Sequence, residues 1–218
     1  MRPFPYSIVP AIVGSLVCFV LLILATISSP MVDTIYFLKL ITAPDEPEPL
    51  PSNTTVTFGV FGMSSNDGRR SLVSLGYSPS NWSGLGVDDP TVNQPSLKSI
   101  TYALILHPIG AFLAIIAFGF STIGLCSRTG AVFSTLVSLF LSILLLTIFI
   151  IDIVFFSILK SQFTDAPYER RRTEYGNALW IVLVALLAAV VCAGSSFWTA
   201  FVGRNRYPRR KWANRREY

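Results

Sequence analysis

Four long stretches that contain no formal charge constrain this chain more than any other feature of its sequence. The uncharged stretches are residues 3–32, 99–127, 129–151 and 175–203. Each is longer than the roughly 20 residues that a helix needs to cross the core of a bilayer. They predict four transmembrane helices, at residues 8–29, 100–126, 130–158 and 176–202. Only 13% of all residues are charged, against about 25% in a soluble domain, which also indicates an integral membrane protein.

The first stretch was weighed against a secretory signal peptide. The apolar core of a signal peptide is usually about 7–15 residues long and ends at small residues that a peptidase recognises. Here the apolar run is longer, and Ala25-Thr26-Ile27 is a poor cleavage site. The sequence therefore predicts a retained helix. The expected fold is a membrane all-α four-helix bundle with a small extracellular β-sheet.

Basic residues predict the orientation of the helices, because they concentrate in short cytoplasmic loops and tails. The tail at 203–218 has seven basic residues and one acidic residue, whereas the loop at 30–99 has four basic and seven acidic residues. The basic segment 169–174 opposes this bias, but neighbouring acidic residues almost balance it. The expected cytoplasmic segments are 1–7, 127–129 and 203–218, and the expected extracellular loops are 30–99 and 159–175.

The basic tail has a second interpretation besides orienting the chain. Its basic residues alternate with Tyr207 and Trp212, a pattern that suits binding to anionic lipids of the inner leaflet at about 1 kcal/mol per basic residue. The two roles are compatible. The expected headgroup contacts are Arg204, Arg206, Arg209, Arg210, Lys211, Arg215 and Arg216.

Two N-glycosylation sequons, at Asn53 and Asn81, lie in the loop at 30–99. A luminal enzyme would reach both there, so they favour the same topology. The cysteines Cys18, Cys126 and Cys192 all lie within or at the ends of the predicted helices. No disulfide is therefore expected to brace the long loop.

The long loop contains the pattern of a β-hairpin. Residues 56–63 alternate as a strand does, and residues 70–78 form a second candidate strand. Asn66-Asp67-Gly68 between them is favourable turn chemistry, because glycine accepts positive φ. The sequence predicts a hairpin over about 56–78. An isolated hairpin is only marginally stable, so further strands are expected from 34–40 and from the loop at 160–170.

Asp152 is an acidic residue inside an apolar segment of the third predicted helix. An unpaired carboxylate at mid-bilayer costs about 2.5–3.5 kcal/mol. His107 lies 21 residues before Arg128 and Asp152 lies 24 residues after it, so antiparallel helices would place both at similar depth. Pro108 lacks an N–H and leaves the carbonyl of Leu104 free. His107, Pro108 and Asp152 are therefore the expected intramembrane polar cluster. Its alternative roles are a structural pair, a partner contact and a proton-responsive switch.

Small residues recur at helical spacing in the second and fourth predicted helices. Such stripes let helices approach closely. They pack either this protein's own bundle or the helix of a partner. The positions are Gly110, Ala114, Ala117, Ala185, Ala189 and Ala193.

Reactive chemistry is not indicated by the sequence. The chain has one histidine, no thiol cluster, no metal-ligand spacing and no glycine-rich phosphate loop. The expectation is a protein that is not an enzyme and has no cofactor or metal.

Three motifs give the chain a resemblance to a known family: GVFGM at 59–63, LILHPIGA at 104–111 and IIDIVFF at 150–156. Together with four spans and a long first outer loop, they resemble the fungal PalI family. That family groups PalI-type ambient-pH signalling components with four-span proteins of eisosome membrane domains, and it looks distantly related to claudins. The resemblance covers nearly all of the chain and implies a claudin-like topology.

Two features differ from that family's pattern. Many relatives carry a cysteine pair after the first outer strand, whereas Met63 and Ser64 stand at the position of the first cysteine. PalI-type proteins often have a long cytoplasmic tail, whereas this sequence ends at residue 218. The expected role is therefore exerted within the membrane.

The resemblance implies a plasma-membrane protein that places or stabilises a larger membrane partner, such as a seven-span pH sensor. One alternative is a structural organiser of membrane domains or cell contacts that works by self-association. Another is an auxiliary subunit of a cell-wall synthase or a transporter. The expected partners are a multi-span membrane protein or a second copy of this chain, together with anionic lipids and no nucleic acid.

Overall fold

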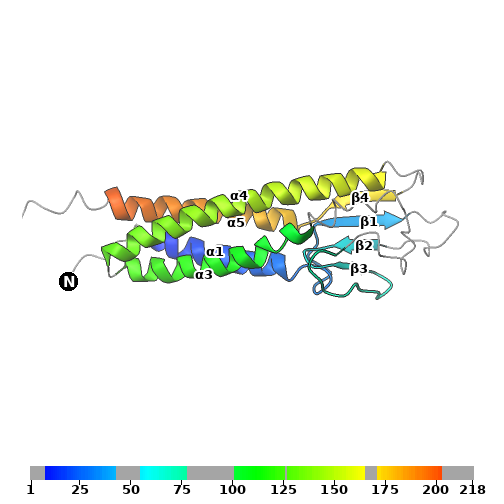
Figure 1. Cartoon of the computed structure of the whole chain (residues 1–218), viewed down its shortest axis with the longest axis horizontal. Coiled ribbons are helices and arrows are strands. Elements are labelled where there is room, and N and C mark those ends of the chain that lie inside the picture. Colours follow the sequence, from blue (N-terminus) through cyan, green and yellow to red (C-terminus); the bar gives the residue numbers. More distant parts are fainter. Residues whose placement is uncertain (1–7, 43–54, 78–100, 126, 165–170, 203–218) are drawn as a thin grey trace, which may run out of the picture.

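The chain folds into a bundle of helices with a small β-sheet at one end (Figure 1). The computed structural model describes residues 8–42, 55–77, 101–125, 127–164 and 171–202. Four of its helices are long and apolar enough to cross a membrane, which confirms that part of the predicted fold. The helices are α1 (Val9–Thr26), α3 (Leu106–Gly124), α4 (Arg128–Thr164) and α5 (Ala178–Phe197), and α5 continues into the π-helix η4 (Trp198–Val202).

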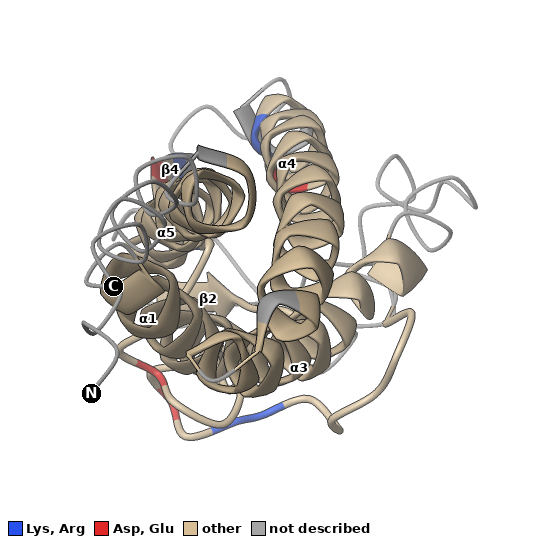
Figure 2. Cartoon of the chain, turned by 90° about the vertical axis from the view of Figure 1, so that its left-hand side faces the viewer, with Lys and Arg blue, Asp and Glu red and all other residues tan. Residues whose placement is uncertain are grey.

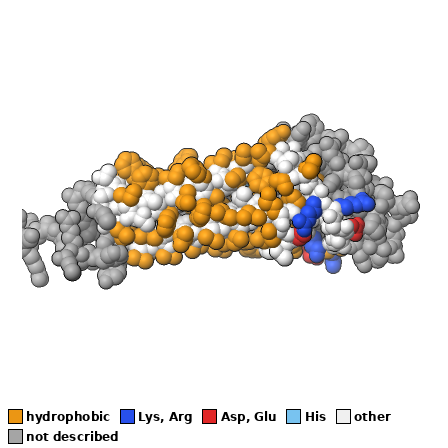
Figure 3. Space-filling model, turned by 90° about the horizontal axis from the view of Figure 1, so that it is seen from below, with side chains coloured by type: hydrophobic (Ala, Val, Ile, Leu, Met, Phe, Trp, Pro, Cys, Tyr) orange, Lys and Arg blue, Asp and Glu red, His pale blue; other side chains and the backbone are white. Residues whose placement is uncertain are grey.

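The four helices form a ring in which α1 and α4 each pack against both α3 and α5 (Figure 2). Small side chains such as Ala114 and Ala189 face the interior of the ring and are fully buried, whereas large ones such as Phe112 and Leu187 point outward. The outer surface of the bundle is consequently a belt of apolar side chains (Figure 3). This distribution is typical of membrane helices, whose contacts depend on close backbone approach.

Helix α4 extends well beyond the predicted span of 130–158. Its 37 residues correspond to about 55 Å, against about 30 Å for the bilayer core. In Figure 1 the last turns of α4 run alongside the sheet. Phe155, Phe156 and Leu159 on these turns are fully buried and belong to the same core cluster as residues of the sheet. The extra length therefore supports the sheet.

The sheet is antiparallel and has the strand order β3-β2-β1-β4. Alternate residues face the core: Leu38 pairs with Phe58 and Leu40 with Val56, and all four side chains are buried. On the opposite face, Lys39 pairs with Glu174 across β1 and β4. The strands are β1 (Leu38–Thr42), β2 (Thr55–Phe58), β3 (Met63–Ser65) and β4 (Arg171–Tyr175).

The predicted hairpin of 56–63 with 70–78 is wrong in its pairing. The chain reverses earlier, because Gly59 N–H donates to the Gly62 carbonyl, and β2 pairs with the short strand β3 instead. The predicted turn at Asn66-Asp67-Gly68 is present, with Gly68 at φ +80°. It leads only to one isolated bridge, between Ser64 and Arg70.

The two additional strands were predicted in part. The first, expected at 34–40, is β1, shifted to Leu38–Thr42. The second does come from the loop after the third span, but as Arg171–Tyr175 and not within 160–170. The reason is the length of α4, which continues as helix to Thr164.

Tyr77 fastens the sheet to the start of the second span. Its side chain is buried, and its hydroxyl donates a hydrogen bond to the Gly59 carbonyl at 2.9 Å. The Thr101 hydroxyl in turn donates to the Tyr77 carbonyl at 3.1 Å. Burial raises the pKa of the Tyr77 hydroxyl above its ordinary value of 10.0, so the hydroxyl stays protonated as a donor.

Changing Tyr77 to phenylalanine is expected to lower the free energy of unfolding by about 1–2 kcal/mol, because it leaves the buried Gly59 carbonyl without this donor. Thermal unfolding in detergent micelles measures the loss. Tyr102→Phe is the matched control, since the Tyr102 side chain is half exposed. Equal melting temperatures for the two variants would contradict the assigned role of the hydroxyl.

Candidate functional site

His107 and Asp152 meet inside the bundle, near its sheet-side end. His107 lies in the first turn of α3 and Asp152 lies on α4, and both are fully buried. The distance between His107 Nε2 and Asp152 Oδ2 is 3.2 Å. The antiparallel packing of α3 and α4 therefore brings together the two polar side chains for which the sequence predicts similar depth.

Pro108 explains the orientation of the histidine ring. A proline in an α-helix cannot donate to the carbonyl four residues earlier, which here is that of Leu104. This carbonyl instead accepts from the backbone N–H of His107 and lies 3.1 Å from His107 Nδ1. Because a carbonyl cannot donate, Nδ1 must carry the proton of that hydrogen bond. The proline thus supplies the acceptor that fixes the ring.

The fixed Nδ1 proton determines the charge of the pair. With Nδ1 protonated, one further proton must lie between Nε2 and Asp152 Oδ2, since two lone pairs would repel at 3.2 Å. The pair is then either a neutral imidazole with a carboxylic acid or an imidazolium with a carboxylate. Its net charge is zero in both cases, which avoids most of the cost of an isolated intramembrane charge. Among the described residues, Asp152 Oδ1 has no hydrogen-bond partner.

Phe37, just before β1, covers the pair from the side of the sheet. Its ring contacts the His107 ring edge-on, at 5.7 Å between centroids, and stacks on Phe156 of α4 at 4.9 Å. The backbone of Phe37 is held on both sides, because its N–H donates to the Phe58 carbonyl and its carbonyl accepts from Gly176. The polar pair is therefore in direct contact with a residue that belongs to the sheet. The sequence analysis missed this residue.

The small-residue positions mostly face the inside of the bundle. Ala114, Ala117, Ala185 and Ala189 are fully buried, whereas Ala193 is only half buried. A side chain at Gly110 would contact Leu22 of α1 and Ile148 of α4. These residues pack the four helices of this chain against one another.

A second polar cluster lies in the half of the bundle away from the sheet, and the sequence analysis missed it as well. The Ser134 hydroxyl of α4 is 2.7 Å from that of Ser121 on α3 and 3.0 Å from that of Ser196 on α5. The Cys192 thiol is 3.2 Å from the Ser138 hydroxyl and donates to the Ala11 carbonyl of α1. The cluster thus links all four helices. Serines within the predicted spans were the available signal, since such hydroxyls commonly bond between membrane helices.

An apolar layer separates the two clusters. Ser138 and Asp152 are about 21 Å apart along α4, and the fully buried side chains of Leu141, Leu145 and Ile148 lie between them. Within the described residues the interior therefore contains no continuous row of polar groups from one end to the other. This arrangement suits a static bundle better than a pathway for ions or protons.

Several predicted site residues lie outside the described residues. They are the sequon residues Asn53 and Asn81 and the basic tail residues Arg204, Arg206, Arg209, Arg210, Lys211, Arg215 and Arg216. In the part of the chain that is described, no group of three or more His, Cys, Asp or Glu side chains could hold a metal ion.

Comparison with known proteins agrees with the resemblance seen in the sequence. The family model described as the SUR7/PalI family matches residues 8–192. A curated relative, the pH-response regulator protein palI/RIM9 of Emericella nidulans, is 34% identical over 109 residues. The match covers 49% of this chain and 17% of that relative, so the chain spans less than a fifth of the relative's length. With its four membrane-spanning helices, the chain is a multi-pass membrane protein that belongs to the SUR7/PalI family.

Proposed function

We propose that this chain is a non-enzymatic plasma-membrane protein that stabilises a larger multi-span partner in the response to ambient pH. The observation that carries the proposal is its similarity to a pH-response regulator within the SUR7/PalI family. In this proposal the sheet faces the outside of the cell and both termini lie in the cytoplasm, as the positive-inside bias of the tail favours.

The geometry of the bundle supports a binding role. The polar side chains of both clusters bond within the chain, so they do not depend on another protein for a partner. The outer faces of the helices carry large apolar side chains instead, such as Leu136 and Phe140 on α4 and Leu187 on α5. A partner in the membrane would therefore contact the outward apolar faces and not Asp152. Van der Waals packing of such faces is an established basis for association between membrane helices.

The test is affinity purification in mild detergent of the tagged chain from a fungal cell that lacks its own copy. We expect a second multi-span protein in stoichiometric amount, and we expect its level to fall in cells without this chain. The variant Asp152→Asn should retain the partner, because Asn keeps a donor for His107 Nε2 inside the bundle. Cells without the chain should also grow poorly at alkaline pH.

The contrary outcome is equally specific. If the chain purifies alone or as copies of itself, and the deletion causes no pH-dependent growth defect, the accessory role in pH response is wrong. Loss of the partner on Asp152→Asn, with the bundle still folded by circular dichroism, would instead place Asp152 at the interface.

A further inference from the structure

The segment Ser71–Tyr77 exposes three apolar side chains at the base of the sheet. Leu72 is 89% exposed, more than any other large hydrophobic side chain in the described residues, and Val73 and Leu75 are 52% and 46% exposed. Adjacent exposed apolar residues are unusual on a surface that faces water, and they commonly mark a contact site. Their position relative to the helix ends indicates what they contact.

Hydrogen bonds hold this segment in place. The Ser71 N–H donates to the Met63 carbonyl at 3.0 Å, and the Ser71 hydroxyl accepts from the Met63 N–H at 2.8 Å. The Ser74 N–H donates to the Phe61 carbonyl at 3.1 Å. At Gly76 the backbone has φ +67° and approaches the Tyr102 ring so closely that a Cβ would overlap it. The outward direction of the apolar side chains is therefore set by a held backbone.

Contacts place the segment level with the sheet-side ends of α1 and α3. Gly62, which contacts the Ser71 side chain, also lies against Pro30, four residues after the end of α1. Gly76 lies against Tyr102, four residues before the start of α3. Tyr102 and Ile105 are themselves exposed and lead on to the outward face of α3. The apolar side chains of the segment thus continue the apolar belt of the bundle.

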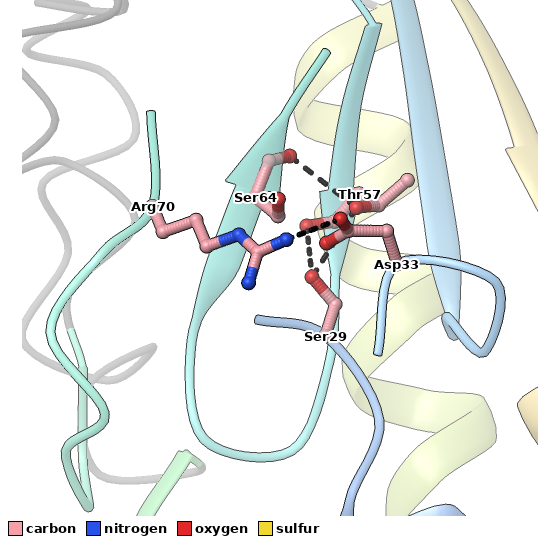
Figure 4. A network of polar contacts seen from close by, with 5 residues as sticks. All are labelled: Ser29, Asp33, Thr57, Ser64 and Arg70. Carbon is pink, nitrogen blue, oxygen red and sulfur yellow. Dashed lines mark hydrogen bonds and ion pairs between the residues drawn. The ribbon is translucent and has the colours of Figure 1, made fainter. Parts of the chain in front are cut away.

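Charged groups begin at the same level. The Arg70 guanidinium, next to the segment, forms an ion pair of 2.7 Å with Asp33, and both side chains are about half exposed (Figure 4). In Figure 3 the charged side chains start where the apolar belt of the helices ends. An apolar group directly beside a charged pair is the arrangement found where a bilayer's acyl region meets its headgroups.

We propose that Leu72, Val73 and Leu75 insert into the bilayer leaflet on the sheet side of the bundle. Lipid acyl chains are the occupant of this surface because it is continuous with the lipid-facing belt and ends at an ion pair at headgroup level. The inserted side chains would hold the sheet down against the membrane surface. The sheet would then have a fixed height above the bilayer.

Spin labelling in nanodiscs of phosphatidylcholine tests the proposal. A label at Leu72→Cys is compared with a label at Asp67→Cys, whose side chain is exposed at the tip of the turn. Both are made in a chain with Cys126→Ser, because Cys18 and Cys192 are buried. We expect the ratio of oxygen to nickel-chelate accessibility, which reports depth in the bilayer, to be severalfold higher at position 72 than at 67.

Equal nickel-chelate accessibility at the two positions would overturn the proposal. The nanodiscs contain no second protein, so a surface reserved for a protein partner would also face water and give that result. Substitution at position 72 does not disturb packing, since Leu72 is almost fully exposed. A folded labelled chain, checked by circular dichroism, is therefore expected in both cases.

Discussion

Changing His107 to leucine is expected to lower the free energy of unfolding of the bundle by about 3–5 kcal/mol, the range for breaking one side of a buried pair. The substitution leaves Asp152 inside the bundle, where among the described residues only His107 bonds its carboxyl group. It also removes the ring that Phe37 contacts. Unfolding by a titration of sodium dodecyl sulfate into mild-detergent micelles, followed by circular dichroism, measures the loss.

The design is a double-mutant cycle. Asp152→Leu alone should also destabilise the bundle, whereas the double variant His107→Leu/Asp152→Leu should recover most of the loss, because apolar replacement of a whole buried pair is often close to neutral. Ile150→Ala is the control on the same helix, since Ile150 points outward. Single variants no more costly than this control, or a double variant with purely additive losses, would show that the pair does not hold α3 and α4 together.

The pairing of His107 with Asp152 illustrates what the sequence contains about the site. Both residues lie at countable distances from the same tight link, so helix geometry predicts nearly equal depth. The role of the Leu104 carbonyl also follows from Pro108 through the missing N–H. Phe37 could not be predicted in the same way. It reaches the pair only because β1 is paired on both sides, with β2 and β4, which come from two different loops.

The hairpin shows where local signals are insufficient. The turn at 66–68 was predicted from its residues and exists, but a nearby turn closed by Gly59 and Gly62 decides which strands pair. Both turns are chemically favourable, so the sequence alone does not rank them. The choice depends on contacts with distant residues, such as Ser28, whose hydroxyl accepts a hydrogen bond from the Val60 N–H. The serine cluster was missed for a related reason, because single hydroxyls in an apolar span have no distinctive pattern.

Changing Gly59 to alanine is expected to destabilise the sheet by about 3 kcal/mol, the upper part of the range for overpacking a buried site. A Cβ at Gly59 would lie 1.9 Å from the carbonyl oxygen of Ser29, which is backbone and has no rotamer by which to move away. The segment after α1 would have to shift. That shift would break the contacts of the Ser29 hydroxyl with Thr57 (Figure 4) and of the Ser28 hydroxyl with Val60.

Limited proteolysis of the chain in nanodiscs measures this effect, because a displaced sheet exposes its strands while the helices stay protected in lipid. Gly176→Ala should behave in the same way, since a Cβ there would lie 1.8 Å from the Tyr36 carbonyl oxygen. The matched controls are Gly119→Ala in α3 and Gly194→Ala in α5, where nothing lies within 4 Å of the added methyl group. Alanine is favoured over glycine within a helix by roughly 0.5–1 kcal/mol, so the controls should be unchanged or slightly more stable. If Gly59→Ala is cleaved no faster than they are, the close approach of the turn to Ser29 does not hold the sheet on the bundle.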